Sequence, residues 1–342
     1  MSINNQTIQS WITSKAGAIS RLKLVEDTLV LSNVKDVCVA VKSVGLNFSD
    51  IFALTGLYSA TPKGSFTPGL EFAGEVIHVG AQGSKFKVGD RVMGVTRFGG
   101  YTTHIITHDD YLQALPDHWN FEQGAGYLVQ TLTAYYALKV LGNIQSRHNV
   151  LIHSAAGGVG LQAMRIVRAI GATPIGTVRS NKKAQFLKEQ GFESILVREK
   201  NFQKQLISQQ LEFDLVLDGI GGMIQKASFN ALRPMGRLIV FGAAEFTPGR
   251  NRPKYLQAAL QYLIRPKYDV MDMISNNKSV MAFNLIWLWE HLTVMKSLIA
   301  DMGAVDIPPP HIGHVFPFDQ AHQAIQCLRS GNTLGKVVLV HC

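Results

Sequence analysis

The sequence predicts an α/β protein in which a small all-β barrel accompanies a doubly wound parallel sheet. The length of 342 residues exceeds what one hydrophobic core usually serves, so two domains are expected. Short β-rich runs separated by glycine turns fill the first third of the chain, which is typical of a small barrel. From Asn149 onward, strand and helix patterns alternate, and this alternation is typical of a parallel sheet covered by helices.

The predicted elements follow from these patterns. In the first third, strands are expected at 22–31, 36–44, 72–79, 91–95 and 101–107, followed by a helix over 121–141. In the alternating part, strands are expected at 150–153, 174–178, 194–197, 215–218 and 237–241, with helices at 158–170 and 182–190. Helices near 256–264, 286–301 and 318–329 precede a last strand at 336–340, which we place back in the first domain. The predicted boundaries are therefore 1–128, 129–284 and 285–342, the middle piece being an insertion.

Composition and charge narrow the class of protein. The net charge of +9 comes from basic residues spread along the chain, without a block of five or six like charges, so no nucleic-acid partner is expected. The excess is interpreted as a solvated surface plus a phosphate pocket. Three distant cysteines and eleven histidines show neither a disulfide framework nor metal-ligand spacing. The start lacks the pattern of a signal peptide, and no apolar run reaches ~18 residues, so a cytoplasmic location is expected.

The strongest local signal is the segment VLIHSAAGGVG at 150–160, which reads as a strand, a glycine loop and a helix start. Ala155 stands where the first glycine of a dinucleotide loop is usual, Gly157 lets the backbone approach a pyrophosphate, and Gly160 permits close packing of helix and strand. With Gly158 and Val159 they place the N–H groups of a helix N-terminus toward the anion. A plain strand-to-helix turn that merely uses glycines is the alternative.

The end of the second strand of this unit indicates which nucleotide binds. Binders of NAD carry an acidic residue about 20 positions after the loop, but Arg179 stands there in this chain. Arg179, Ser180 and Lys183 would bind a 2′-phosphate through charge-assisted hydrogen bonds, so NADPH is the predicted cofactor. Alternatively, these residues only begin a surface helix.

Five segments carry a family resemblance, namely GLNFSD at 45–50, PGLEFAG at 68–74, VGDRV at 88–92, the glycine loop and GKVVL at 335–339. Their order and spacing resemble the medium-chain dehydrogenase/reductase superfamily, in particular its quinone oxidoreductase branch. Segments 232–242 and 317–325 resemble the vesicle-amine-transport-like proteins. The resemblance implies a GroES-like β-barrel catalytic domain and a Rossmann cofactor domain, with a cleft between them.

Zinc-dependent members of that superfamily have Cys and His where this chain has Asn47 and Leu70, and only Glu71 is retained. One carboxylate cannot hold a catalytic zinc, which needs three protein ligands, so no metal is expected. Without a Lewis acid an alkoxide is not stabilised, whereas reduction of a quinone or a polarised C=C needs no metal. The resemblance therefore implies reduction of quinones or α,β-unsaturated carbonyls.

The resemblance also implies the remaining site residues. Asn47 and Tyr58 lie near the nicotinamide in related reductases, the tyrosine serving as proton donor or substrate anchor. Thr133 is expected to meet the carboxamide. Phe241 and Gly242 are expected to wall the nicotinamide, and Asn332 to reach the cofactor from the closing segment. A packed loop tyrosine, a local turn bond of Asn47 and an ordinary helix threonine are the alternatives.

Three further expectations concern residues around this site. Val197 stands where close quinone reductases often carry a tyrosine on the 2′-phosphate side, and Arg198 could compensate. His153 is interpreted as a satisfied core or loop histidine rather than a base. A homodimer is expected, because the strands at 215–218 and 237–241 are predicted to end the sheet without a charged or proline guard.

A binding module of a different class is the alternative function. It would be a nucleotide-binding protein on a lipid or vesicle surface, with little or no catalysis. The segment 255–265 has an apolar face with basic residues at both ends and could lie on a membrane. Such a stripe more often packs on its own domain or on a dimer partner, so membrane association is not favoured.

Overall fold

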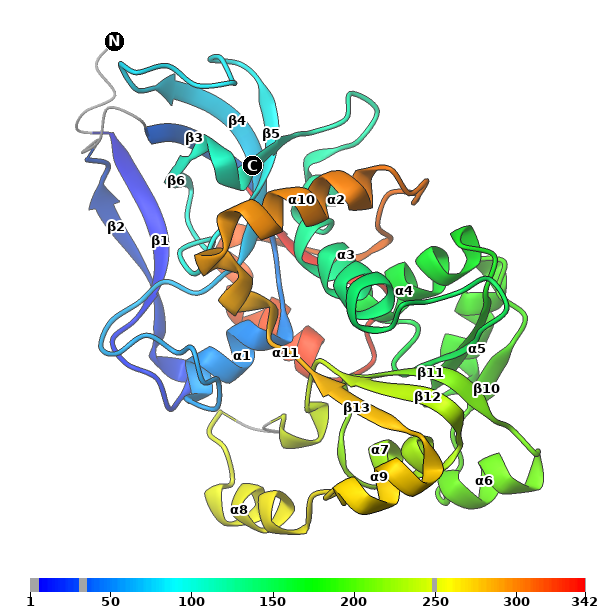
Figure 1. Cartoon of the computed structure of the whole chain (residues 1–342). Coiled ribbons are helices and arrows are strands. Elements are labelled where there is room, and N and C mark those ends of the chain that lie inside the picture. Colours follow the sequence, from blue (N-terminus) through cyan, green and yellow to red (C-terminus); the bar gives the residue numbers. More distant parts are fainter. Residues whose placement is uncertain (1–5, 31–35, 248–250, 342) are drawn as a thin grey trace.

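Two sheets, side by side, organise the computed structural model, which describes residues 6–30, 36–247 and 251–341 (Figure 1). The first sheet takes strands from both ends of the chain, and the second takes strands from its middle. This arrangement confirms the predicted fold class, an α/β protein with a GroES-like domain and a parallel Rossmann sheet.

The catalytic-domain sheet has seven strands in the order β14-β15-β3-β4-β5-β7, and β6 also pairs with β3. Its strands are β3 (Asp36–Gly45), β4 (Glu71–Val79), β5 (Arg91–Val95), β6 (His104–His108), β7 (Leu112–Ala114), β14 (Ile312–Pro317) and β15 (Lys336–Val340). The hairpin of β1 (Thr7–Thr13) and β2 (Leu22–Thr28) lies beside it. As predicted, the last strand returns to this domain, where β15 pairs with β3.

Helix α1 (Phe48–Thr55) of this domain was not expected from the sequence. It begins after Asn47, whose backbone N–H donates to the carboxylate of Asp50, and it ends at Gly56, where φ is +76°. Short helices η1 (Ile19–Arg21), η2 (Asp109–Tyr111) and η6 (Phe318–Gln320) and helix α11 (Ala321–Arg329) also belong to this domain.

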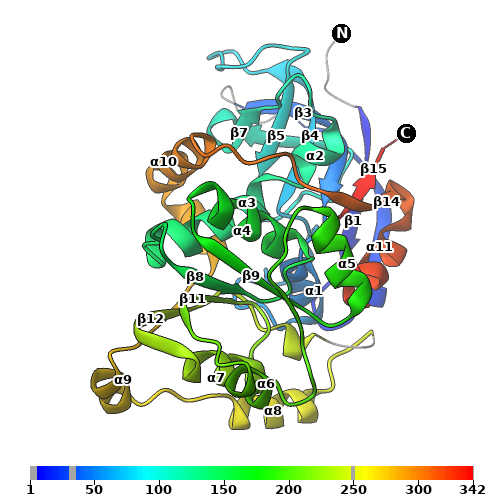
Figure 2. The same cartoon turned by 90° about the vertical axis from the view of Figure 1, so that its right-hand side faces the viewer.

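The cofactor-domain sheet has six parallel strands in the order β10-β9-β8-β11-β12-β13. Figure 2 shows β8, β9, β11 and β12 of this sheet side by side. These are β8 (Asn149–Ile152), β9 (Thr173–Val178), β10 (Ile195–Val197), β11 (Phe213–Asp218), β12 (Leu232–Val240) and β13 (Ser279–Ala282). The connecting helices are α4 (Gly158–Ala169), α5 (Asn181–Glu189), α6 (Phe202–Ser208) and α7 (Gly222–Asn230). Strand β8 is central, and its apolar residues are fully buried because helices cover both faces. The chain order reverses beside β8, where open parallel sheets bind ligands.

Two predicted helices are interrupted in the structure. The segment 121–141 divides into α2 (Phe121–Ala125), α3 (Leu128–Tyr135) and the π-helical turn η3 (Tyr136–Leu141), with a break at Gly126. The segment 286–301 divides into η5 (Leu285–Glu290) and α10 (Leu292–Gly303). Hydrophobic spacing alone did not reveal these breaks, because it continues through them.

The predicted sheet edge was wrong. Strands β11 and β12 do not end the sheet, because β13 pairs in parallel with β12 from Arg237 to Val240. The four residues of β13 are too few for an alternating pattern to stand out. The edge strands of the sheet are therefore β10 and β13.

Between β12 and β13 the chain leaves the sheet through η4 (Ala244–Phe246), α8 (Tyr255–Ile264) and α9 (Val270–Asn276). Neither α8 nor α9 has a buried residue, although both are rich in apolar side chains. In the described parts of the chain, no helix combines the length and the apolar character needed to cross a bilayer.

Candidate active site

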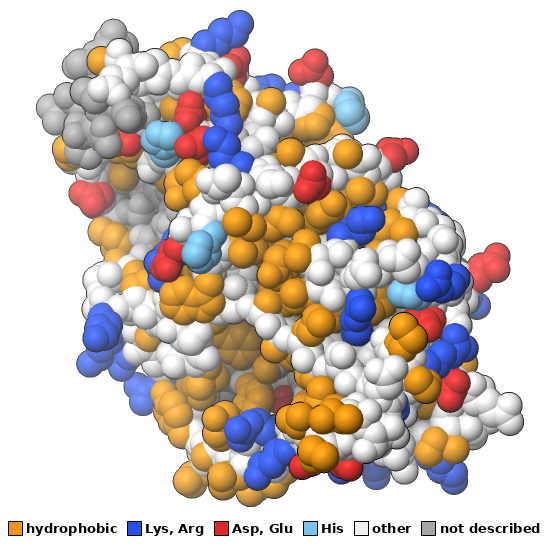
Figure 3. Space-filling model, viewed as in Figure 1, with side chains coloured by type: hydrophobic (Ala, Val, Ile, Leu, Met, Phe, Trp, Pro, Cys, Tyr) orange, Lys and Arg blue, Asp and Glu red, His pale blue; other side chains and the backbone are white. Residues whose placement is uncertain are grey.

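A cleft of about 1390 Å³ lies between the two domains and is lined by residues of both. In the lower half of Figure 3 its mouth is a hollow surrounded by hydrophobic side chains. Predicted site residues that line it include Asn47 and Tyr58 from the catalytic domain. From the cofactor domain, the predicted residues along the cleft are Thr133, Gly157, Gly158, Val159, Gly160, Arg179, Lys183, Phe241 and Gly242.

The glycine loop has no room for a side chain at Gly158 or Gly160, so its backbone lies close to neighbouring atoms. A Cβ on Gly160 would lie 2.7 Å from the Cα of Ala155, and a Cβ on Gly158 would collide with the side chain of Gln130. The loop leads directly into α4, and the first N–H groups of a helix have no partner within it. The Oε1 atom of Gln130 is also buried without a hydrogen bond among the described residues. The N–H groups at the start of α4 are therefore suited to a phosphate, whereas Gln130 Oε1 is an acceptor and can pair only with a donor of the ligand.

Three cations gather where β9 and β10 end. Arg179 Nη2 and Lys183 Nζ donate to the carbonyl oxygen of Gly331, at 3.0 and 2.7 Å, and Arg198 Nη1 donates to Thr177 Oγ1 at 2.8 Å. Burial, with Arg179 and Arg198 nearby, lowers the pKa of Lys183 to about 8. Burial and Arg179 lower the pKa of Arg198 to about 10. Since none of the three forms an ion pair with a described carboxylate, the cluster is suited to an anion.

Three predicted cofactor residues do not line the cleft. The Ser180 hydroxyl accepts a bond from the N–H of Lys183 and caps α5. Ala155 is fully buried beneath the glycine loop. Asn332 is exposed, whereas its neighbours Gly331 and Thr333 line the cleft.

The other end of the cleft is apolar with a few polar groups. Thr133 lies on α3 and donates its hydroxyl to the carbonyl oxygen of Val129 at 2.7 Å. Phe241 and Gly242 follow β12, as predicted, and the ring of Phe283 packs 6.5 Å from that of Phe241. Space for a planar ring beside these aromatic side chains suits a nicotinamide.

A buried ion pair occupies the position at which zinc-dependent relatives would bind metal. Lys336 Nζ lies 2.5 Å from Glu71 Oε1 and 2.8 Å from Asn47 Oδ1, and Asn47 Nδ2 donates to Glu71 Oε1 at 3.0 Å. The other oxygen of Glu71 accepts the N–H of Val129 at 3.0 Å. Leu70 offers no ligand atom, and Glu71 is fully engaged, so these residues do not fit a catalytic zinc.

Asp50 lies directly behind this ion pair. Its Oδ2 accepts from the N–H of Asn47 at 2.8 Å and from the hydroxyl of Tyr101 at 3.1 Å. Its Oδ1 has no partner in the described part of the chain. Complete burial raises the pKa of Asp50 to about 7, although both donors and Lys336 oppose the shift.

The Tyr58 side chain crosses the cleft. Its hydroxyl donates to Asn284 Oδ1 at 2.8 Å, which links the loop after α1 to the segment after β13. Burial raises the pKa of Tyr58 to about 12 despite this bond. The hydroxyl therefore stays protonated and can donate a hydrogen bond into the cleft.

His153 is a satisfied core histidine, as the sequence suggested. Its ring nitrogens lie 2.8 Å from Thr177 Oγ1 and 2.7 Å from Ser228 Oγ. Burial and then Arg198 lower its pKa to about 3, so the ring is neutral.

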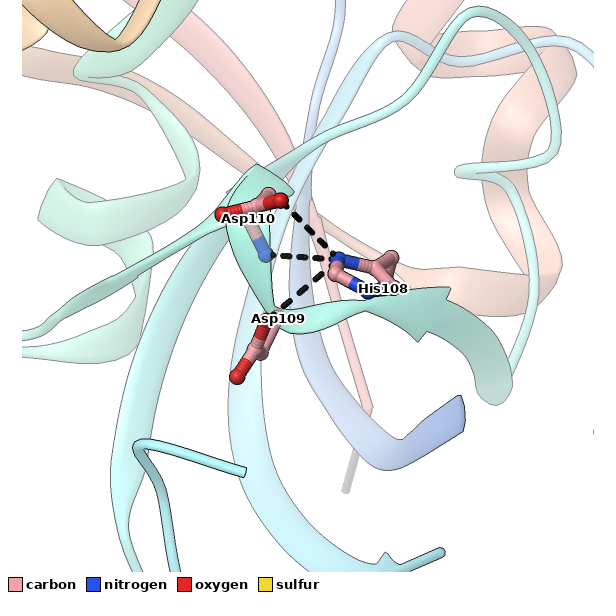
Figure 4. Close-up of side chains that lie close together, drawn as sticks. All are labelled: His108, Asp109 and Asp110. Carbon is pink, nitrogen blue, oxygen red and sulfur yellow. Dashed lines mark hydrogen bonds and ion pairs between the residues drawn. The ribbon is translucent and has the colours of Figure 1, made fainter. Parts of the chain in front are cut away.

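Figure 4 shows a further cluster at the end of β6, where two carboxylates face the His108 ring. Each carboxylate lies 3.3 Å from His108 Nδ1. Asp110 also forms a 2.6 Å ion pair with Lys296, and Asp109 accepts from Ser84 Oγ at 2.8 Å. These bonds hold α10 and a neighbouring loop against β6, which is a structural role.

Sequence reasoning missed three residues of the cleft. Lys336 was seen only as part of a family motif, Asn284 stands in no motif, and Gln130 was seen only as part of the helix. The lysine directly after Gly335 was the one available signal, since a lysine inside a short buried strand needs a partner.

Comparisons with known proteins agree with this geometry. Residues 33–127 match the family model of the alcohol dehydrogenase GroES-like domain, and residues 158–286 match that of the zinc-binding dehydrogenases. The human synaptic vesicle membrane protein VAT-1 homolog is 32% identical over 305 residues, covering 87% of this chain and 77% of that protein. A quinone oxidoreductase of Pseudomonas aeruginosa is 34% identical over 239 residues, covering 68% of this chain and 73% of that protein.

A solved structure extends the likeness over the whole molecule. The quinone oxidoreductase of Thermus thermophilus, also solved with NADPH, superimposes with a TM-score of 0.80 at 25% identity, covering 97% of this chain and 99% of that one. The fold and cleft thus define a two-domain oxidoreductase. The chain belongs to the medium-chain dehydrogenase/reductase superfamily and is of the quinone oxidoreductase type.

Proposed function

We propose that this protein is an NADPH-dependent, metal-independent reductase that transfers hydride to a quinone or an α,β-unsaturated carbonyl compound. One observation carries the proposal: Arg179, Lys183 and Arg198, none of which has a carboxylate partner in the described part of the chain, line the same cleft as the glycine loop and Tyr58. The NADPH-bound relative from Thermus thermophilus supports a cofactor of the NADP type.

The protein groups have separate roles in this scheme. Arg179 and Lys183 bind the 2′-phosphate, and the N-terminus of α4 binds the pyrophosphate. Phe241, Gly242 and Thr133 form the wall for the nicotinamide ring, which supplies the hydride when NADPH is bound. Tyr58 donates a hydrogen bond to the oxygen of the acceptor, where negative charge develops.

The reaction balances without a metal. One NADPH, one proton and the acceptor give NADP⁺ and an acceptor reduced by two electrons. In an enone the hydride adds to the β-carbon, and the proton is taken up at the α-carbon. The ammonium group of Lys336, beside Asn47, provides a positive charge where zinc-dependent relatives have a metal ion. Elemental analysis is therefore expected to find no stoichiometric zinc. Chelators are expected to leave the activity unchanged.

Cofactor oxidation by the purified protein tests the proposal directly. NADPH consumption is followed with quinones, alkenals and enoyl thioesters, and the variants Arg179→Ala and Lys183→Ala are compared with wild type. Each variant is expected to weaken NADPH binding by roughly 1–3 kcal/mol while leaving NADH binding nearly unchanged. Equal losses for both cofactors would show that the 2′-phosphate site is elsewhere.

A second candidate is a vesicle-surface module that binds the nucleotide without efficient catalysis. The exposed apolar side chains of α8, with Leu256 90% exposed, favour it, as does the name of the human relative. Vesicle sedimentation beside the NADPH assay separates the two candidates. Binding to vesicles without oxidation of NADPH by any acceptor would favour the module.

A homodimer formed through the edge strand β13 is part of the proposal. The strand is four residues long and has no proline or charged side chain. Pairing with its symmetry mate would extend the parallel sheet across the dimer. Light scattering at micromolar concentration is expected to give the mass of a dimer, and a monomeric mass would contradict it.

A cytoplasmic location stays a prediction, which cell fractionation can check.

A further inference from the structure

The cleft extends beyond the nicotinamide end into a section that the proposed reaction does not use. This section, called here the apolar section, is formed by the cleft-lining residues of α1, of α8 and of the segment around Trp289. Aromatic side chains from three separate parts of the chain line it: Phe48 and Phe52 of α1, Trp289 after β13, and Tyr255 and Tyr262 of α8.

Charged groups are confined to other parts of the cleft. The charged residues among its described lining are Arg179, Lys183, Arg198, Glu245, Arg329 and Lys336. Arg179, Lys183 and Arg198 form the cation cluster where β9 and β10 end, Arg329 is the last residue of α11, two positions before Gly331, and Lys336 is paired with Glu71. The carboxylate of Glu245 lies against Gly221 and Gly222 at the start of α7. None of these residues belongs to α1 or α8, so an uncharged ligand is favoured in the apolar section.

The size of the cleft allows a second occupant. Pockets for one small ligand usually measure ~300–1000 Å³, whereas this cleft measures about 1390 Å³. A dinucleotide along the glycine loop therefore leaves room for a sizeable acceptor.

Helix α8 is held across the mouth of the cleft, yet it is poorly covered. Before the helix, Asn251 is fixed to the catalytic domain: its Oδ1 accepts the N–H of Ser20 at 2.6 Å, and its carbonyl accepts the N–H of Ile19 at 3.1 Å. After the helix, the chain returns through α9 to the cofactor sheet. Even so, the cleft-lining residues Tyr262 and Leu263 are 57% and 68% exposed.

An apolar wall that faces water inside a cleft is stabilised by an apolar ligand. We propose that the acceptor of this reductase carries a long hydrocarbon tail, which lies between α1 and α8 while its conjugated head faces the nicotinamide. This inference rests on the proposed function and adds the class of substrate. The acceptor is expected to have a hydrocarbon tail, and its head group is not specified.

A homologous series of enones with one head and alkyl chains of increasing length tests the proposal. For wild type, kcat/KM is expected to rise with chain length, by up to roughly fourfold for each buried methylene, until the apolar section is filled. A quinone series with the same tails shows whether the effect follows the tail or the head. A flat profile in both series, with the short members still reduced, would overturn the tail but leave the reductase intact.

Matched variants of α8 test where in the cleft the hydrocarbon tail binds. Ala259 lines the cleft, and Gln257 on the same helix does not. Ala259→Trp is expected to abolish most of the ratio of long-chain to short-chain kcat/KM, whereas Gln257→Trp keeps the wild-type ratio. Leu263→Ser lowers the same ratio by removing apolar surface, and it serves where Ala259→Trp fails to bind NADPH. Wild-type ratios in both cleft-facing variants would overturn the placement between α1 and α8.

Binding without turnover separates this inference from the proposed function. Equilibrium binding of a long-chain and a short-chain enone to the protein with NADP⁺ is measured by calorimetry. Tighter binding of the long chain, lost in Ala259→Trp, supports the apolar section even if no acceptor oxidises NADPH, a result that would refute only the reductase. Equal binding of both chains would refute the tail.

Discussion

The hydroxyl of Tyr58 donates a 2.8 Å hydrogen bond to Oδ1 of Asn284, so a side chain of the catalytic domain is tied to the segment that follows the last strand of the cofactor sheet. Asn284 Oδ1 also accepts the N–H of Ile286 at 3.3 Å, which fixes the amide in this orientation. The hydroxyl proton points at Asn284, and an acceptor in the cleft must compete with Asn284 for it.

Tyr58→Phe removes the only proton that this side chain can donate, and kcat/KM for the acceptor is expected to fall by roughly 10- to 100-fold. NADPH affinity is expected to stay at the wild-type level, because Tyr58 lies away from the phosphate sites. Tyr111→Phe, outside the cleft, is the control. Since the pKa of Tyr58 is about 12, the rate should show no step from this group below pH 10. A Tyr58→Phe variant with normal kcat/KM would remove Tyr58 from the mechanism.

NADPH affinity should depend on pH through Lys183. Its pKa of about 8 in the free protein lies below the ordinary 10.5, so the ammonium loses its proton as pH rises through 8. The neutral amine no longer attracts the 2′-phosphate, and the Kd for NADPH should increase between pH 7 and pH 9. The Kd for NADH should not change in parallel. Lys183→Arg, which stays charged, should flatten the profile. The same rise in that variant would assign the pH dependence to another group.

The buried pair of Lys336 and Glu71, at the floor of the cleft, should contribute strongly to the free energy of unfolding. Their side chains are 4% and 1% exposed. Lys336→Met leaves the Glu71 carboxylate buried without its partner, and the free energy of unfolding should fall by about 3–5 kcal/mol. The double variant Lys336→Met with Glu71→Gln should recover part of this loss, because no unpaired charge is left. Denaturant unfolding measures both values. A loss below about 1 kcal/mol in the single variant would mean that water reaches Glu71.

Asp50 should make the protein less stable as pH rises. The folded protein keeps the proton of Asp50 up to about pH 7, whereas the unfolded chain releases it near 3.8. The folded state therefore binds more protons in this window, and the free energy of unfolding falls between these two values, by up to about 4 kcal/mol. Asp50→Asn keeps an acceptor for Asn47 and Tyr101 and cannot ionise, so its stability should vary less with pH.

Denaturant unfolding at pH 5 and pH 8 compares this variant with wild type and with Asp306→Asn, an exposed control. Identical pH dependence in all three proteins would show that Asp50 is already ionised at pH 5.

The sequence predicted those parts of the molecule whose patterns are local. The glycine loop at Gly157–Gly160 and the basic residues after β9 stand at the spacing of one strand–helix–strand unit, so a joint role could be predicted from the sequence. The parallel strands around β8 were recognisable because both faces are buried and the apolar runs are continuous.

Contacts between distant segments could not be predicted in the same way. Lys336 meets Glu71 across 265 positions of sequence, and Tyr58 meets Asn284 across 226. No spacing rule connects such pairs; only the packing of the two sheets brings them together. Strand β13 was missed for a related reason, since its four residues become a strand by pairing with β12.

The ammonium of Lys336 has a further consequence for how the site is assembled. In this chain the positive charge beside Glu71 is covalently attached to the polypeptide, on the first residue of β15. This charge is part of the polypeptide and does not require the protein to bind a metal ion. A competing ion cannot displace it, and a single codon change suffices to remove or reverse it. The pair forms only when β15 has joined β3 in the sheet, so the floor of the cleft depends on the pairing of segments 265 positions apart.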